Sequence, residues 1–155
     1  MKTNWKLLFE NLAISLMVGG LAGIISNNAR QVYDQIAKPA GSPPAWVFPV
    51  VWTVLYVFMG VGAYLISKSN HPGKENALWI YRVQLFLTLI WPIFFFNQGN
   101  YQKAFYLLCV LWISILIMII SFFKISKCAA LLQLPYLLWV TYAGYLNYQI
   151  VRLSA

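Results

Sequence analysis

The chain has 155 residues, of which 61% are hydrophobic and only 9% carry a charge. A soluble domain has about half apolar and a quarter charged residues, so this composition lies far outside the soluble range. No compact domain of this length has enough interior to hide so much apolar surface from water. The composition therefore excludes an ordinary soluble protein and predicts one that is covered by lipid.

The formal net charge of +8 arises from eleven Lys and Arg against Glu10, Asp34 and Glu75. Proteins that bind nucleic acid gather such cations in a stripe or patch. Here the cations stand near the ends of apolar segments and in the connections between them, as in membrane proteins. We therefore expect no nucleic-acid partner, and we expect contact with anionic lipid headgroups.

Five apolar runs are long enough to cross a membrane, which takes about 20 helical residues. They cover residues 7–26, 45–67, 78–96, 104–123 and 128–151. Open strands are excluded because lipid offers no partner to unpaired backbone groups, and barrel strands are about half as long. The sequence predicts an all-α membrane protein with a single domain, residues 1–155, built as a bundle of five transmembrane helices.

The first run contains Gly19 and Gly23 at a spacing that lets two helix backbones approach closely. This pair indicates either a homodimer face or close packing within the bundle. The connection that follows, residues 27–44, is long and carries Tyr33, Lys38 and three prolines. Long connections of mixed composition are typical of lids and binding loops, so a lid is favoured over a plain linker.

In the second run, Phe48, Trp52 and Tyr56 recur every four residues. This spacing places three aromatic rings on one face of a helix. Such a face packs inside a bundle or lies in the aromatic belt at the membrane boundary. Trp52 is about two turns inside the helix, which is too deep for the belt at that end and favours an interior lined by rings.

The third and fifth runs each place a proline beside aromatic residues. Trp91 precedes Pro92, and Pro135 stands one turn before Trp139. A proline inside a span bends the helix, which either shapes the bundle alone or opens room for a ligand. Trp139 and Ala143 share a helix face, and a small residue beside an indole favours a slot for a flat ligand.

A loose sterol-contact pattern near the end of the chain consists of Leu146, Tyr148 and Arg152. This pattern is frequent by chance. Tyr148 and Arg152 also suit the membrane interface as anchors, and that interpretation is favoured.

Residues that carry acid–base or metal chemistry are scarce. Glu10 is the only carboxylate within the five runs, and the single histidine, His71, lies in a connection. Cys109 and Cys128 have neither a CxxC spacing nor a neighbouring histidine. We therefore expect no metal site, no covalently bound cofactor, no hydrolase and no proton-driven transport.

Five spans place the two termini on opposite sides of the membrane. The side with the N-terminus and the second and fourth connections carries seven Lys and Arg, counting Arg82, against four on the other side. The positive-inside rule then places the N-terminus in the cytoplasm. The loop of residues 27–44 and the C-terminus would lie outside.

Many of these motifs occur together in the order known from one family. They are Tyr33, Lys38-Pro39, Pro43-Pro44, Trp46, Trp52 to Tyr56, Met59-Gly60, Trp91-Pro92, Phe94-Phe95, Pro135-Tyr136, Trp139, Ala143 and Leu146-Asn147. Over essentially its whole length the chain resembles the translocator protein family, the tryptophan-rich sensory proteins of bacteria and the peripheral benzodiazepine receptor of mitochondria. It departs from the family at Val32, at Ala40-Gly41 and at Thr88, where Trp, an aromatic residue and Asn are frequent.

The resemblance implies a pocket closed by the first loop, in a bacterial plasma membrane. The implied ligands are porphyrins, isoquinoline carboxamides and sterol-like lipids. The implied chemistry is a breakdown of protoporphyrin that depends on light and oxygen, with Trp52 and Trp139 as the pocket tryptophans that take part. The implied lining comprises Tyr33, Pro43, Phe48, Tyr56, Trp91 and Ala143 in addition to these two.

The function predicted from these features is binding of a tetrapyrrole, as ligand or substrate, for sensing or disposal. One alternative is a carrier or exporter of porphyrin or lipid. Another is a regulatory membrane partner without chemistry of its own.

Overall fold

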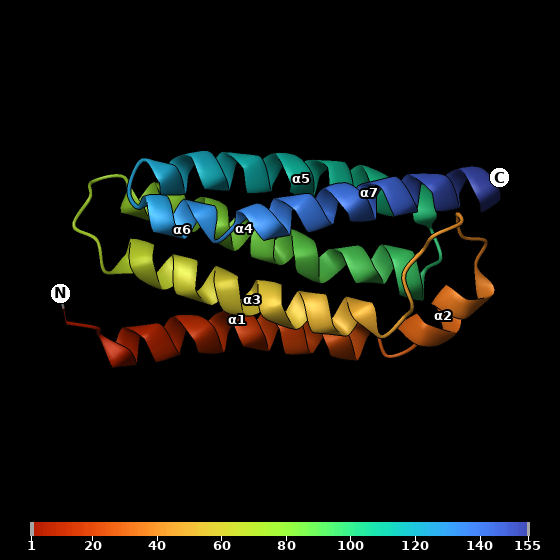
Figure 1. Cartoon of the computed structure of the whole chain (residues 1–155), viewed down its shortest axis with the longest axis horizontal. Coiled ribbons are helices and arrows are strands. Elements are labelled where there is room, and N and C mark those ends of the chain that lie inside the picture. The colour runs from red at the N-terminus through yellow and green to blue at the C-terminus, as the bar shows by residue number, and fades with distance from the viewer. Residues whose placement is uncertain (1, 155) are drawn as a thin grey trace.

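The structure, a computed structural model, describes residues 2–154, and nearly all of them are helical (Figure 1). The long helices are α1 (Trp5–Ile25), α3 (Val47–Ser67), α4 (Lys74–Pro92), α5 (Tyr101–Phe123) and α7 (Leu134–Ser154). The short elements are α2 (Ala29–Gln35), the π-helical turn η1 (Ile93–Asn97) and α6 (Lys127–Leu131). The expectation of an all-α protein is confirmed, and no strand occurs within residues 2–154.

Four segments have the length and hydropathy of membrane spans: α1, α3, α4 together with η1, and α5. Their outward faces carry large exposed apolar side chains, such as Phe9 and Ile24 on α1 and Ile113 and Ile117 on α5. So much exposed apolar surface indicates contact with lipid. Helix α7 is as long as α3, with 21 residues, but it is more polar and is not among the four.

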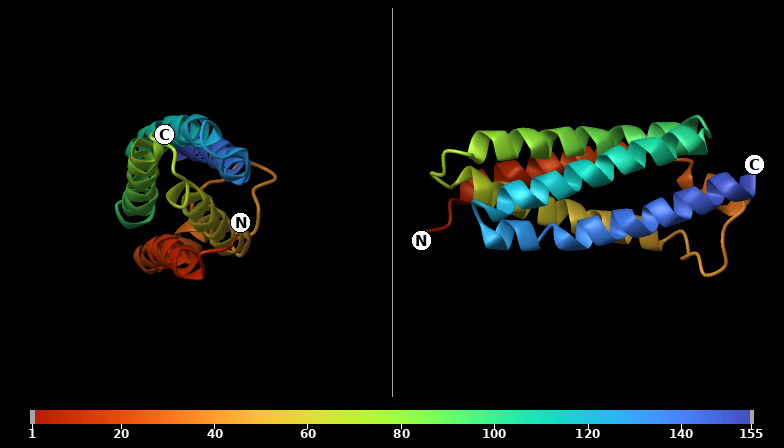
Figure 2. Two further views of the ribbon diagram at one scale, coloured as in Figure 1. Left: turned by 90° about the vertical axis from the view of Figure 1, so that its left-hand side faces the viewer. Right: turned by 90° about the horizontal axis from the view of Figure 1, so that it is seen from above.

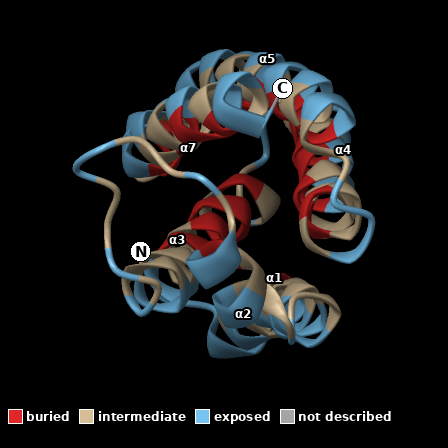
Figure 3. Ribbon diagram, turned by 90° about the vertical axis from the view of Figure 1, so that its right-hand side faces the viewer, coloured by how far each residue is buried: buried red, intermediate tan, exposed pale blue. Residues whose placement is uncertain are grey.

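The long helices run side by side as one bundle (Figures 1 and 2). Helix α1 packs on α3, while α4 and α7 flank α5. Viewed along the bundle, the buried residues of α3, α4, α5 and α7 face a common interior (Figure 3). The N-terminus and the α3–α4 and α5–α6 connections lie at one end, and α2, η1 and the C-terminus lie at the other.

Helix α1 approaches α3 closely because glycines face it. A Cβ atom on Gly60 would lie 3.0 Å from the Cα of Leu12 and 2.6 Å from the Ser15 hydroxyl. A Cβ atom on Gly19 would lie 2.7 Å from the Tyr56 ring, whereas nothing lies within 4 Å of one on Gly23. Of the glycine pair in the first run, Gly19 therefore serves packing within the bundle and Gly23 remains open to the outside.

The predicted fifth run is broken between α6 and α7. Pro135 near the start of α7 has no N–H group with which to continue the helical bonds of α6. At the break, the fully buried Gln133 donates its Nε2 to the carbonyl of Phe58 on α3 (3.1 Å) and to that of Ala129 (3.4 Å). Its amide lies against Gly62, so that any larger residue there would collide with it.

The connection of residues 27–44 contains a helix, α2, that the composition did not predict. Asn28, which caps α2, donates its side-chain amide to the carbonyl of Phe96 in η1 (3.2 Å). The π-helical turn η1 directly follows Pro92, which lacks an N–H group, and it closes with a bond from Gln98 N–H to the Ile93 carbonyl (2.9 Å). These contacts hold the connection against the end of the bundle.

Candidate functional site

The connection between α1 and α3 is fastened by Tyr33. This side chain is buried, and its hydroxyl donates to the carbonyl of Pro43 (2.5 Å). The Lys38 ammonium donates to the carbonyl of Tyr33 (2.5 Å) and lies 4.7 Å from the centre of its ring. Burial raises the pKa of the Tyr33 phenol above its ordinary value, so this hydroxyl stays a hydrogen-bond donor to higher pH than an exposed tyrosine.

A chain of aromatic rings leads from this connection to α7. The centre of the Tyr33 ring lies 5.2 Å from that of Phe48 on α3, and Phe48 lies 5.5 Å from Trp139 on α7. Trp139 in turn lies 5.8 Å from Tyr142. The edge-to-face arrangement of the first two pairs is a favourable one for aromatic rings. The three segments therefore meet through ring contacts at this end of the bundle.

A groove of about 450 Å³ lies between α3 and α7, next to these rings. Its lining is apolar and consists of Val50, Val51, Val54, Leu55, Pro135, Leu138, Trp139 and Tyr142. Val50, Val54 and Leu138 are 55%, 46% and 70% exposed on the outer surface of the bundle. The groove therefore opens sideways, toward the surface that faces lipid.

Trp139, which lines the groove, has an unpaired polar group. Its indole N–H is buried and has no hydrogen-bond acceptor among residues 2–154. A buried donor without a partner costs roughly 1–3 kcal/mol, and proteins rarely leave one without a reason. An acceptor on a molecule seated in the groove would remove this cost.

Trp52 and Tyr56 lie on the inner side of α3, away from the lining of the groove. The Trp52 ring lies 5.8 Å from that of Tyr56 and 6.1 Å from that of Tyr136 on α7. The Tyr136 hydroxyl donates to Oε1 of the fully buried Gln84 on α4 (2.6 Å). Trp52 therefore borders a buried polar cluster. Of the two predicted pocket tryptophans, only Trp139 lines the groove.

The other predicted lining residues have separate positions. Trp91 stacks on Phe95 at 4.8 Å and donates its N–H to Oδ1 of Asn147 (3.3 Å), within the cluster around η1. Ala143 packs against the core, and Pro43 takes part through its carbonyl group. The structure brings Tyr33, Pro43, Phe48 and Trp139 together, while Trp52 with Tyr56, and Trp91, belong to neighbouring clusters.

Most residues that line the groove were not predicted from the sequence, because valines and leucines are equally common at positions that face lipid. The available signal was the spacing of four between Val50 and Val54 and between Leu138 and Tyr142. Each pair marks one helix face beside the aromatic positions.

In the sterol-contact pattern, Leu146 is buried, whereas Tyr148 and Arg152 are exposed. The Arg152 guanidinium lies 6.0 Å from the centre of the Tyr148 ring. The three residues therefore do not form one exposed surface.

The groups in the site permit binding by burial, ring contact and hydrogen bonding. Within residues 2–154, no three His, Cys, Asp or Glu side chains gather where they could hold a metal ion. The indole of Trp139 and the phenol of Tyr142 are the oxidisable groups in the lining of the groove.

Comparison with known proteins places the chain among relatives of similar length. The profile of the TspO/MBR family matches residues 11–153. The tryptophan-rich protein TspO of Chlorobaculum tepidum is 33% identical over 97% of this chain and 99% of its own. Protein CrtK of Rhodobacter capsulatus is 32% identical over 95% of this chain and 92% of its own. The human translocator protein is 36% identical over 77% of this chain and 73% of its own. With its apolar helices and this match over nearly its whole length, the chain belongs to the TspO/MBR family of integral membrane proteins.

Proposed function

We propose that this protein binds a flat, largely apolar tetrapyrrole, protoporphyrin, in the groove between α3 and α7. The observation that carries the proposal is the unpaired, buried N–H of Trp139 in the wall of an apolar groove. A porphyrin with carboxylate side chains offers both a large apolar face and an acceptor for that N–H. The volume of the groove, about 450 Å³, also fits, because pockets for small-molecule ligands usually measure about 300–1,000 Å³.

Ring contacts supply further binding energy. Phe48, Trp139 and Tyr142 present aromatic surface next to the groove, and each aromatic pair contributes about 0.5–1.5 kcal/mol beyond burial. Isoquinoline carboxamides and sterol-like lipids are also flat and apolar, and the carboxamide carbonyl is an acceptor. We expect them to compete for the same groove.

The disposal part of the proposal is photochemical. An excited porphyrin takes one electron from the Trp139 indole, and dioxygen accepts that electron and becomes superoxide. The oxidised indole gives its N–H proton to the ligand carboxylate that it binds, and the superoxide attacks the porphyrin or the tryptophan radical beside it. Trp52 is a second candidate donor, although it lies outside the groove lining, beside Tyr56 and Tyr136.

The test is a titration of the purified protein with protoporphyrin in darkness, followed by illumination in air. Trp139→Phe keeps an aromatic ring but lacks the N–H, so we expect weaker binding by about tenfold and slower loss of protoporphyrin. Trp79→Phe is the matched control because Trp79 is 64% exposed on the outer face of α4. Trp52→Phe tests the second donor.

Equal binding and equal photochemical loss in the Trp139→Phe and Trp79→Phe proteins would refute the proposed site. Binding without loss under light in the unaltered protein would remove the disposal step and leave sensing or carriage.

The same proposal includes five membrane crossings, with the N-terminus in the cytoplasm and the plasma membrane as location. Helix α7 supports this count because two of its polar side chains are hydrogen-bonded to residues of α5. Asn147 donates to the carbonyl of Tyr101 (3.0 Å), and Thr141 accepts from Trp112 (2.8 Å), both on α5. A helix that satisfies its polar groups in this way can lie in lipid despite its lower hydropathy.

Carriage of a porphyrin or lipid is the second candidate. It is favoured by the sideways opening of the groove, through which an apolar molecule can enter from the bilayer without crossing water. Flux of protoporphyrin between vesicles in darkness separates the two candidates, because a carrier accelerates transfer whereas a binding or disposal protein retains or consumes its ligand.

A further inference from the structure

Two polar side chains inside the bundle are buried without all of their hydrogen bonds. Gln84 on α4 is 0% exposed, and Tyr81, almost one turn earlier on the same helix, is 4% exposed. The amide nitrogen of Gln84 and the hydroxyl of Tyr81 have no hydrogen-bond partner among residues 2–154. An unpaired buried donor is costly, and hydrocarbon cannot supply the missing acceptor. The two side chains therefore mark a site for a polar molecule.

The two donors face the same region of the interior. Residues three apart on a helix lie on one face, so Tyr81 and Gln84 project from α4 together. The Tyr136 hydroxyl on α7 donates to Oε1 of Gln84 (2.6 Å), and the phenol groups of Tyr136 and Tyr81 interact electrostatically. The bond from Tyr136 fixes the Gln84 oxygen toward α7, while the N–H groups of the amide stay free.

Helix α1 borders this region with Ser15. This residue is fully buried and lies beside the Tyr81 hydroxyl. The Ser15 hydroxyl donates its hydrogen to the Leu12 carbonyl (3.2 Å), so its oxygen can still accept a bond. A Cβ atom on Gly60 of α3 would lie 2.6 Å from that oxygen, so α3 leaves Ser15 little room to turn away.

These groups match the hydrogen-bonding capacity of water. A water molecule can accept from the Tyr81 hydroxyl and from a Gln84 N–H, and it can donate to the Ser15 oxygen. Buried waters usually make about three such bonds. An anion would satisfy the two donors but not the Ser15 oxygen, and it would lack a counter-charge, because no charged side chain is buried within residues 2–154.

We propose that a water molecule is bound inside the bundle between Tyr81, Gln84 and Ser15. It links α4 to α1, which pack against each other, and it satisfies both unpaired donors. The proposal does not rest on porphyrin binding, because none of these three residues lines the groove between α3 and α7.

The first measurement detects the water directly in the full chain, with isotope-labelled side-chain amides, in a deuterated, uncharged detergent. Cross-relaxation from water to the Gln84 amide protons is recorded in the rotating frame, where its sign separates it from proton exchange. Gln84→Met identifies the Gln84 signal. Asn147 is the matched control, because it is also buried and its amide is bonded at both ends, to Trp91 and Tyr101. We expect cross-relaxation at Gln84 and none at Asn147.

The second measurement uses the sign of a stability change, because Tyr81→Phe removes only the hydroxyl. If this hydroxyl is bonded to water, its loss raises the equilibrium constant for unfolding, by about two- to tenfold. If the hydroxyl is unpaired, its loss lowers this constant or leaves it unchanged, because an unsatisfied donor disappears. Tyr145→Phe is the matched control on the exposed side of α7, and it should change the constant less than about twofold.

Absence of cross-relaxation at Gln84 would overturn the proposal. Equal cross-relaxation at Gln84 and Asn147 would also overturn it, because water would then reach buried amides in general. An unfolding constant that is unchanged or lowered in Tyr81→Phe would exclude Tyr81 as a partner of the water and so overturn the bridge between α4 and α1. If Tyr81→Phe does not fold, the cross-relaxation of the unaltered protein decides.

Discussion

At the scale of single residues, the close approach of α1 to α3 depends strongly on Gly60, which has no side chain. The backbone of Leu12 lies so close to Gly60 that even a methyl group would be within 3.0 Å of its Cα atom. A flexible side chain can move away from such a contact, but a helix backbone cannot do so without shifting the whole of α1.

We therefore predict that Gly60→Ala destabilises the protein, by about 1–3 kcal/mol from overpacking. Gly20→Ala is the matched control, since Gly20 lies on the same pair of helices and nothing is within 4 Å of its added Cβ. It should stabilise α1 by up to about 1 kcal/mol through helix propensity. The free energy of unfolding of each variant, measured in mixed detergent micelles, tests the prediction. If Gly60→Ala and Gly20→Ala changed this free energy by the same amount and in the same direction, the packing described would be contradicted.

At the scale of elements, the connection between α1 and α3 is an ordered segment at the end of the bundle that carries α2. Helix α2 and the bonds of Tyr33, Lys38 and Ser42 hold it, with Ser42 donating to the Pro39 carbonyl (2.7 Å). Departures of this chain from the family pattern, at Val32 and Ala40-Gly41, fall in this element. Gly41 has a φ of 84°, a conformation that favours glycine over an aromatic residue.

Removing the Tyr33 hydroxyl should loosen this connection. Tyr33→Phe keeps the ring contact with Phe48 but loses the bond to the Pro43 carbonyl, which is worth about 0.5–1.5 kcal/mol. We expect hydrogen exchange of the amides in residues 36–46 to accelerate about two- to tenfold. Tyr106→Phe, on the exposed side of α5, should leave their exchange unchanged. Unaltered protection in Tyr33→Phe would mean that the loop is held by other contacts.

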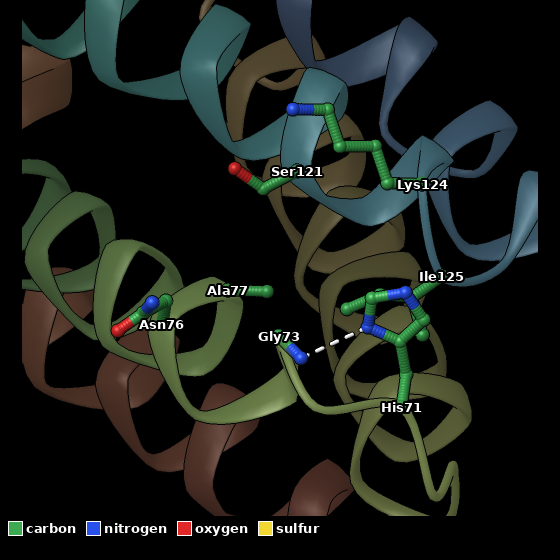
Figure 4. A pocket seen from close by; sticks show the side chains of 7 residues that line it. All are labelled: His71, Gly73, Asn76, Ala77, Ser121, Lys124 and Ile125. Carbon is green, nitrogen blue, oxygen red and sulfur yellow. Dashed lines mark hydrogen bonds between the residues drawn. The ribbon is translucent and has the colours of Figure 1, made fainter.

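At the scale of the whole molecule, the two ends of the bundle differ in chemistry. One end carries α2, η1 and the rings of Tyr33 and Phe48. The other end carries the cationic connections and a pocket lined by residues such as His71, Ser121 and Lys124 (Figure 4). The charge difference between the ends is the basis for placing the cationic end in the cytoplasm. The number of crossings and the orientation can be tested in one experiment.

Single cysteines placed in a background with Cys109→Ser and Cys128→Ser report which side of the membrane each connection occupies. We expect Gln98→Cys and Ser154→Cys to react with an impermeant maleimide in intact cells. Asn70→Cys should react only after permeabilisation. All three positions are exposed in the structure. If Ser154→Cys reacted only under the conditions that label Asn70→Cys, and not under those that label Gln98→Cys, helix α7 would not cross the membrane.

The long helices were predictable because the length and hydropathy of an apolar run can be read from consecutive residues, without knowledge of distant contacts. The runs at residues 45–67 and 104–123 nearly coincide with α3 and α5. A bend at Pro135 was expected in the fifth run, but the bond from Gln133 at the break to the Phe58 carbonyl was not, because it joins two helices that are distant in sequence. Helix α2 was missed for the same kind of reason, since its contact with Phe96 joins segments 68 residues apart.

By itself, the sequence determined that this protein lies in lipid, that it is helical and that it belongs to the TspO/MBR family. These properties follow from composition, from run length and from the order of motifs along one chain. Only the tertiary structure decided that Trp139 lines the groove while Trp52 faces the polar cluster of Gln84 and Tyr136. Helical spacing gives the face of a residue, but which helix lies opposite that face depends on packing between distant segments.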